Sequence, residues 1–275
     1  DAVVQNQNIH FKGEDRKKGE TVIKPGVRIS SSEIGVCATV GKSEVSVSRL
    51  PRTIIISTGD ELVDIDEKPE PHQIRRSNVY RLKTVLSHFN MPVDTAHLED
   101  DREKIERSLK EYLEKYDLLI LSGGVSKGKF DFLPEALEAA GVQKLFHRIM
   151  QRPGKPFWFG IHSSATVFAF PGNPVSSFMC MQQYFVPWLN KSLGENERPV
   201  PMGVLTKRVD FKPDLTYFLE VSVTYGKDGK IMATPVKGNG SGDLANLVDA
   251  EAFIVLPRGH DTYREGSVYP LIFYR

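Results

Sequence analysis

The feature that most constrains the fold is a regular alternation of strand and helix patterns between residues 52 and 195. Strands are predicted for short apolar runs at residues 53–57, 92–98, 117–122, 145–150, 156–159 and 166–170. Helices are predicted at residues 77–89, 102–114, 133–140 and 174–193. Strands that alternate with helices of this length form right-handed crossover units around a largely parallel sheet. The sequence therefore predicts one α/β domain over residues 51–195.

The segments on either side of this alternation have a different character. Residues 1–50 contain a short helix pattern after Ser30 and an alternating strand pattern at residues 44–48, which is too little for a complete domain. Residues 194–201 are rich in Gly, Pro and charge, which is typical of a linker. The remainder predicts a small all-β module over residues 196–275. Its strands are expected at residues 218–225, 231–236, 253–257 and 268–274, with a hairpin turn at 226–229.

Charge and composition argue against several classes of protein. The chain has 36 basic and 35 acidic side chains, so its net charge of +1 offers no broad field to nucleic acid or to an acidic membrane surface. The longest apolar runs fall far short of the roughly 20 residues that span a bilayer, and no signal peptide follows Asp1. Because the first residue is not Met, we expect a fragment. Cys37 and Cys180 lie in apolar stretches, which favours reduced core thiols and a cytoplasmic location.

The loops that follow the predicted strands are the places to search for a site, because open parallel sheets bind ligands at the carboxyl ends of their strands. The first such loop is Ser-Thr-Gly-Asp-Glu-Leu at residues 57–62. Its Asp60 could bind a divalent cation or orient a water molecule. The alternative is that Asp60 only caps a turn. Farther along, Asp100 and Glu103 have the spacing of a capping box, which we interpret as a helix start.

The second loop, at residues 122–128, is rich in glycine. Glycine lets the backbone approach a ligand closely, and exposed N–H groups beside Ser122 and Ser126 would form a nest for an anion. The loop matches neither the phosphate-loop pattern nor the dinucleotide-binding pattern. Nucleotide binding therefore cannot be inferred from this loop.

The third candidate combines two proline-containing loops, residues 152–156 and 171–176. Asn173 fits a helix N-cap and Pro174 the first helical position, so the last helix would direct free N–H groups and its positive dipole end into this region. Arg152 and Lys155 would add two positive charges. These groups predict a site for a tetrahedral oxyanion. The alternative is that both loops are only tight turns.

Four segments, in this order, closely resemble the signature motifs of one family. Residues 57–62, 122–126, 153–156 and 171–176 resemble the STGDEL, SGGVS, PGKP and PGNPVS motifs of the MoeA and gephyrin E-domain family of molybdopterin molybdotransferases. Near the N-terminus, Gly13-Glu14-Asp15 resembles the GED segment of the family. Residues 240–242 with Leu247, and residues 254–257, resemble the signature of its C-terminal β-barrel. The resemblance implies a mostly parallel three-layer α/β domain of the molybdopterin-binding type, followed by a small β-barrel and preceded by a remnant of an N-terminal lobe.

The resemblance also implies an activity and a set of site residues. The activity is insertion of molybdate into adenylylated molybdopterin with release of AMP, assisted by Mg²⁺, in a homodimer that could cooperate with a molybdopterin adenylyltransferase. Catalytic roles are implied for Asp60, Asp131 and Glu14, of which Asp60 and Asp131 would hold the metal. Roles in holding the pterin phosphate and molybdate are implied for Thr58, Gly59, Ser122, Gly123, Gly124, Ser126, Arg152, Lys155, Pro171, Asn173 and Ser176.

The chain departs from the family pattern at two positions. Arg76 and Lys129 are basic where the family has acidic residues, which would weaken a cation site and strengthen anion binding. The N-terminal lobe with its MDGYA-like segment, which completes the active site across a dimer in relatives, is also absent. Two alternatives to the enzyme therefore stay open. One is a non-catalytic molybdopterin-binding or scaffold module. The other is a molybdopterin adenylyltransferase, against which the β-module and the PGKP loop argue.

Overall fold

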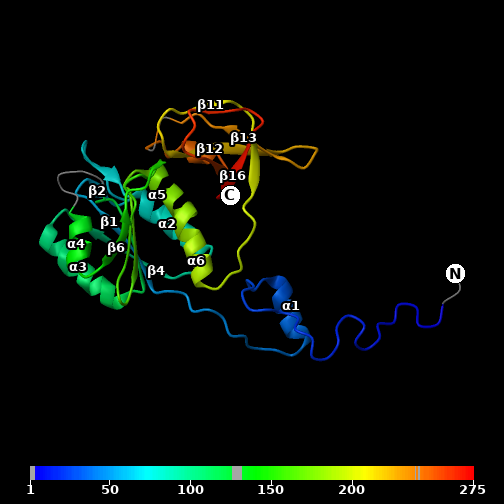
Figure 1. The fold of residues 1–275 in the computed structure, drawn as a ribbon. Helices are drawn as coiled ribbons and strands as arrows, with labels where there is room; N and C mark the ends of the chain where they lie inside the picture. The colour runs from blue at the N-terminus through cyan, green and yellow to red at the C-terminus, as the bar shows by residue number, and fades with distance from the viewer. Residues whose placement is uncertain (1–3, 126–131, 239, 241) are drawn as a thin grey trace. The chain divides into compact units, whose positions relative to one another are not determined.

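The fold was obtained as a computed structural model that describes residues 4–125, 132–238, 240 and 242–275 (Figure 1). The chain forms two compact units. The smaller unit combines the described part of residues 1–49 with residues 190–197, and the larger unit combines residues 50–189 with the described part of residues 198–275. The predicted α/β region and the predicted β-module thus share one compact unit.

The smaller unit contains one complete helix, α1 (Ser31–Thr39), among its described residues. Ser30 caps it in a capping box: the Ser30 hydroxyl accepts from the N–H of Ser32, and the Glu33 carboxylate accepts from the N–H of Ser30 at 2.8 Å. The predicted short helix is confirmed. The strand predicted at residues 44–48 is wrong, because these residues form no ladder. An alternating pattern becomes a strand only where a neighbour takes up its backbone hydrogen-bonding groups.

The larger unit is built on a six-stranded sheet with the strand order β4-β1-β5-β9-β8-β6. Its strands are β1 (Thr53–Thr58), β4 (Val93–Leu98), β5 (Leu118–Ser122), β6 (Gln143–His147), β8 (Trp158–Ile161) and β9 (Thr166–Phe170). The first four strands in this order run parallel, and β8 is antiparallel to both of its neighbours. The prediction of a mostly parallel sheet is confirmed. The strand predicted at residues 145–150 begins and ends earlier than expected.

The central strands explain why the sheet has helices on both faces. All residues of β1 and β5 are buried, and continuous apolar strands of this kind need cover on both sides. The helices are α2 (Ser77–Ser87), α3 (Arg102–Lys115), α4 (Leu133–Ala139), α5 (Pro174–Cys180) and α6 (Val186–Ser192). Helices α3 and α4 cover one face, and α2, α5 and α6 lie on the other (Figure 1). The result is a three-layer α/β domain.

The last helical segment begins at the predicted position but contains an irregular turn. Asn173 is the N-cap residue of α5, and Pro174 occupies the first turn. A π-helical turn, η1 (Met181–Phe185), joins α5 to α6, so the chain is helical from Pro174 to Ser192. π turns inside α-helices occur often at functional sites.

The β-module is a small closed barrel. Its five strands are β10 (Met202–Leu205), β12 (Thr216–Tyr225), β13 (Ile231–Pro235), β14 (Ala252–Leu256) and β16 (Val268–Phe273). They follow the order β13-β10-β16-β14-β12, and the pairing of β12 with β13 closes the ring. The predicted hairpin turn at residues 226–229 joins β12 to β13. Alternate residues of β12, such as Leu219 and Val221, point into the barrel core.

Short pairings complete the fold and connect the α/β layers to the barrel. Strand β7 (Gln151–Arg152) runs parallel to the start of β12, which pairs Gln151 with Thr216 and Arg152 with Tyr217. The other short elements are β2 (Leu62–Val63), β3 (Ile74–Arg75), β11 (Val209–Asp210), α7 (Asn246–Asp249) and β15 (Thr262–Tyr263). Among the described residues, no helix is both long and apolar enough to cross a bilayer.

Candidate functional site

A cleft of about 970 Å³ lies in the larger unit, between the carboxyl ends of the parallel strands and the barrel. It brings together all the described residues that the sequence predicted to hold the phosphate and molybdate. These residues are Thr58, Gly59, Ser122, Gly123, Gly124, Arg152, Lys155, Pro171, Asn173 and Ser176. The three candidate loops, which are far apart in sequence, therefore face one space.

Glycine is required where the second loop meets the first. A Cβ atom added at Gly123 would lie 2.9 Å from Thr58 O, and one added at Gly124 would lie 2.9 Å from Thr58 Oγ1. Both glycines have positive φ angles, +105° and +67°. A side chain at either position would clash and strain the backbone. Thr58 Oγ1 is itself buried, with no hydrogen-bond partner among the described residues.

Asn78, in the first turn of α2, connects the second loop to the third. Its Nδ2 donates to Ser122 Oγ at 2.9 Å and to Gly172 O at 2.7 Å. Its Oδ1 accepts from Arg81 Nη2 at 2.8 Å. Burial lowers the pKa of Arg81 to about 10, so the guanidinium remains charged at neutral pH. The Asn78 side chain thus holds two of the three loops together. Sequence analysis did not single it out, because one Asn at the start of a helix carries no distinctive signal.

The two predicted cations lie in a loop whose central residues are buried and whose outer residues are exposed. Pro153 and Gly154 are buried, whereas Arg152 and Lys155 are exposed and line the cleft. The Arg152 guanidinium lies 5.9 Å from the centre of the Phe211 ring, a cation–π contact with the barrel. Within the described residues, neither cation forms an ion pair. Both charges are therefore available to an anion in the cleft.

The barrel contributes a wall of mixed charge. Arg208 and Lys237 line the cleft, and so does Glu220, a half-buried acid on β12. Burial raises the pKa of Glu220 above its usual range. Sequence analysis missed this residue, because a Glu in an alternating strand looks like any solvent-facing position.

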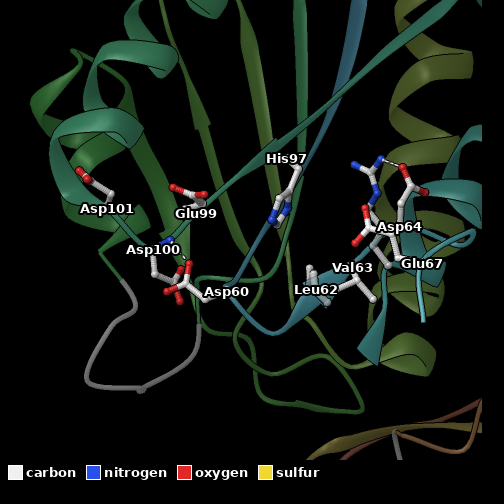
Figure 2. Close-up of a pocket in the computed structure, with 10 residues that line it drawn as sticks. Asp60, Leu62, Val63, Asp64, Glu67, His97, Glu99, Asp100 and Asp101 are labelled. Carbon is white, nitrogen blue, oxygen red and sulfur yellow. Dashed lines mark hydrogen bonds and ion pairs between the residues drawn. The ribbon is translucent and has the colours of Figure 1, made fainter. Parts of the chain in front are cut away.

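Asp60 does not line the large cleft. It lies in a second pocket of about 580 Å³, which shares Leu62, Arg76 and Asp100 with the cleft. Asp60 Oδ1 accepts from the backbone N–H of Asp100 at 2.9 Å. Figure 2 shows Asp60 with Glu99, Asp100 and Asp101 on one side of His97, and Asp64 with Glu67 on the other. The acids thus form two groups rather than one cluster.

The basic residue at position 76 has an acidic partner nearby. The Arg76 guanidinium forms an ion pair with Asp64, and Tyr80 donates a hydrogen bond of 2.6 Å to the same carboxylate. These hydrogen bonds, the one from Arg76 above all, hold the pKa of Asp64 well below its usual range. The positive charge of Arg76 is therefore largely balanced by the negative charge of Asp64. The expectation that Arg76 strengthens bare anion binding needs this correction.

Four predicted positions cannot be placed in the cleft. Ser126, Lys129 and Asp131 lie outside the described residues, and Glu14 belongs to the smaller unit, where its carboxylate accepts from the N–H of Phe11 at 2.8 Å. The roles implied for these residues stay predictions.

The capping box predicted from Asp100 and Glu103 is wrong by one residue. Asp101 is the N-cap of α3, and its carboxylate accepts from the N–H of Lys104 at 3.0 Å. The backbone N–H of Asp100 is instead bonded to Asp60.

A magnesium site cannot be assembled from the described residues. Residues 4–125, 132–238, 240 and 242–275 contain no group of three or more His, Cys, Asp or Glu side chains that could hold a metal ion. Among the described acids near Asp60, Asp64 is tied to Arg76 and Glu99 forms an ion pair with Lys104, so these two do not complete a Mg²⁺ site with Asp60.

Family models match both parts of the larger unit. Residues 54–191 match the model described as "Probable molybdopterin binding domain", which covers half of the chain. Residues 202–273 match the model described as "MoeA C-terminal region (domain IV)". The chain belongs to the MoeA family.

Relatives of this MoeA-family chain agree over almost its whole length. It is 39% identical over 265 residues to a molybdopterin molybdenumtransferase of Synechocystis, with 95% of this chain and 65% of the relative covered. It is 33% identical over 272 residues to a molybdopterin molybdenumtransferase of Bacillus subtilis, with 98% of this chain and 63% of the relative covered. The chain thus spans about two thirds, at most 65%, of the length of these relatives.

Solved structures show the same fold. A molybdopterin biosynthesis MoeA protein from Pyrococcus horikoshii superposes with a TM-score of 0.82 at 26% identity, covering 97% of this chain and 65% of that one. The α/β domain followed by a closed barrel is therefore the MoeA architecture, as the sequence motifs implied.

Proposed function

We propose that this chain carries the molybdate-insertion site of a molybdopterin molybdenumtransferase. In the proposed reaction, adenylylated molybdopterin and molybdate give the molybdenum cofactor and AMP. The observation that supports it best is the convergence of three loops on one cleft with two cations that have no acidic partner among the described residues. The relatives named molybdopterin molybdenumtransferase support the same activity.

The proposed roles follow from the chemistry of each wall. Arg152 and Lys155 would bind the oxyanion by charge-assisted hydrogen bonds, and the helix that begins at Pro174 would direct backbone N–H groups toward it. The glycine turn at Gly123 and Gly124 would let the backbone approach the pterin phosphate. A cleft enclosed between sheet and barrel would also exclude bulk water, which strengthens each of these contacts.

Asp60 would act from the neighbouring pocket. Its carboxylate sits on a loop at the end of a strand and is already oriented by the Asp100 N–H, so it could orient a water molecule at the edge of the cleft. The expected Mg²⁺ depended on Asp60 together with Asp131. It stays a prediction.

The predicted homodimer, the cooperation with an adenylyltransferase and the cytoplasmic location also belong to the proposal. A second candidate function, a binding or scaffold module, is favoured by one observation: Asp64, an acid that lines the same pocket as Asp60, is tied to the cation Arg76. A scaffold would bind adenylylated molybdopterin and leave it intact.

The test is to incubate the chain with adenylylated molybdopterin and molybdate and to measure AMP by chromatography. We expect AMP release that falls at least tenfold in Lys155→Ala. Lys83→Ala is the matched control, because Lys83 is exposed on α2 and does not line the cleft. Tight binding of the adenylylated pterin without any AMP would support the scaffold. Formation of adenylylated molybdopterin from ATP would support an adenylyltransferase.

A further inference from the structure

The loop that carries Arg152 and Lys155 is fixed from behind by a buried side chain. Gln151 is only 1% exposed, and its Nε2 donates to Gly154 O at 3.1 Å. Gly154 lies between the two cations in sequence, so this bond links the residue before Arg152 to the residue before Lys155. Buried amides of this kind are costly to leave without partners, which makes the bond a strong constraint on the loop.

The other end of the Gln151 amide is held by the π turn. Tyr184, in η1, donates its hydroxyl hydrogen to Gln151 Oε1, and its ring packs on Phe157 with centroids 5.0 Å apart. The loop also touches α5 directly. A Cβ atom added at Gly154 would lie 2.7 Å from Cys180 Sγ, so no other residue could sit this close to the helix.

One continuous helical segment therefore supports both halves of the anion site. Its first residue, Pro174, follows the loop that contains Asn173, and its π turn holds the loop that contains Lys155 through the Tyr184–Gln151 hydrogen bond. A π turn inserts one extra residue into the hydrogen-bonded ring, which changes the direction of the side chains around it. In this chain, the turn carries Tyr184 toward Gln151.

We propose that Gln151 and Tyr184 are positioning residues, which hold Arg152 and Lys155 at a fixed separation from the helix start so that the oxyanion site is formed before the ligand arrives. The pair acts through the loop and does not contact the ligand. Preformed donors bind an anion more tightly than mobile ones, because the ordering of the loop is completed during folding. This inference rests on the proposed function, since it presumes that the loop binds an oxyanion.

The experiment measures tungstate binding by calorimetry, together with the melting temperature, for the parent chain and four variants. Tyr184→Phe removes one hydroxyl and leaves Gln151 Oε1 buried without a donor, so it should lower the melting temperature and weaken tungstate binding about three- to tenfold. Gln151→Met with Tyr184→Phe removes both polar partners. This double variant should regain stability relative to Tyr184→Phe, but its affinity should stay about tenfold below that of the parent, because Gly154 O has lost the Gln151 amide donor and keeps only the local Phe157 N–H and the weak Cys180 thiol contact.

Two further variants make the result decisive. Tyr263→Phe loses a similar buried hydrogen bond, to Pro257 O at 2.7 Å in the barrel, and should lower stability without changing tungstate affinity. Lys155→Ala should weaken binding by itself. Affinity that is unchanged in the Gln151 and Tyr184 variants, or that recovers together with stability in the double variant, would overturn the positioning role. If Lys155→Ala binds tungstate as the parent does, the oxyanion site itself, and with it the proposed function, fails.

Discussion

Removing both cations from the cleft is the most direct test of its anion chemistry. Arg152 and Lys155 are exposed and have no ion-pair partner among the described residues, so Arg152→Ala with Lys155→Ala leaves no buried charge unpaired. Surface substitutions of this kind usually change stability by less than about 0.5 kcal/mol. The Arg152 change adds the loss of one cation–π contact at 5.9 Å, about 0.5 kcal/mol at an exposed site. The double variant should therefore fold normally.

The effect on binding should be far larger than the effect on stability. A charge-assisted hydrogen bond contributes about 1.5–3 kcal/mol, and each 1.4 kcal/mol changes affinity about tenfold. Since both side chains are solvent-accessible, the lower value is the appropriate one, which gives about tenfold for each single variant and about 100-fold for the pair if the effects add. Calorimetric titration with molybdate measures this directly. Raising the ionic strength should weaken molybdate binding by the parent and should change molybdate binding by the double variant little.

A folded double variant that binds molybdate as tightly as the parent would refute the assignment of both cations. So would an affinity in the parent that does not depend on salt, because screened charges must lose part of their attraction. Lys83→Ala again controls for a general change in net charge, since Lys83 lies outside the cleft.

Three other predictions concern the walls of the two pockets. Gly123→Ala should lower the free energy of unfolding by about 1–3 kcal/mol in urea titrations, because its φ of +105° and the contact with Thr58 O both resist a Cβ atom; an unchanged midpoint would contradict it. The folded pKa of Asp64 is lowered, so the contribution of its pairing is present above the ordinary aspartate pKa of about 4 and is lost as the pH falls through the folded value. Arg76→Leu should therefore reduce the free energy of unfolding more at pH 6 than at pH 2, and an equal loss at both pH values would count against the pairing. Asp60→Asn should leave the melting temperature near that of the parent, because an amide oxygen can still accept from the Asp100 N–H, while AMP release falls; parallel losses of stability and AMP release would mean a structural role.

The parts of the fold that the sequence predicted are those governed by local pattern. Strands such as β1 and β5 are continuous apolar runs, and the helices between them have clear amphipathic periods, so the parallel sheet follows from short stretches of sequence. The three loops could be located for the same reason, because they come directly after predicted strands. That they meet in one cleft follows from the rule that parallel strands present their carboxyl ends at one edge.

The parts that were missed depend on partners distant in sequence. Strand β7 has two residues and exists because β12 lies beside it, more than 60 positions later. Gln151 and Asn78 matter only through what they touch, and a lone amide in a sequence predicts no partner. Residues 44–48 have the alternating pattern of a strand, but no strand among the described residues lies beside them to pair with, so the strand predicted there does not form. The helix start was displaced to Asp101 because two adjacent aspartates compete for one cap.

Arg76 shows why a charge cannot be assigned to a site from sequence alone. A basic residue in place of an acid at the edge of a cleft suggested stronger anion binding, since the sequence shows the charge and not its partner. In the fold, Asp64 takes up that charge, and the Tyr80 hydroxyl stabilises the same carboxylate. Arg76 thus acts mainly on the acidic pocket, where it ties up the Asp64 carboxylate and leaves it less able to bind a metal. The cations that line the cleft then include Arg152 and Lys155, whose position is controlled by Gln151 and the π turn.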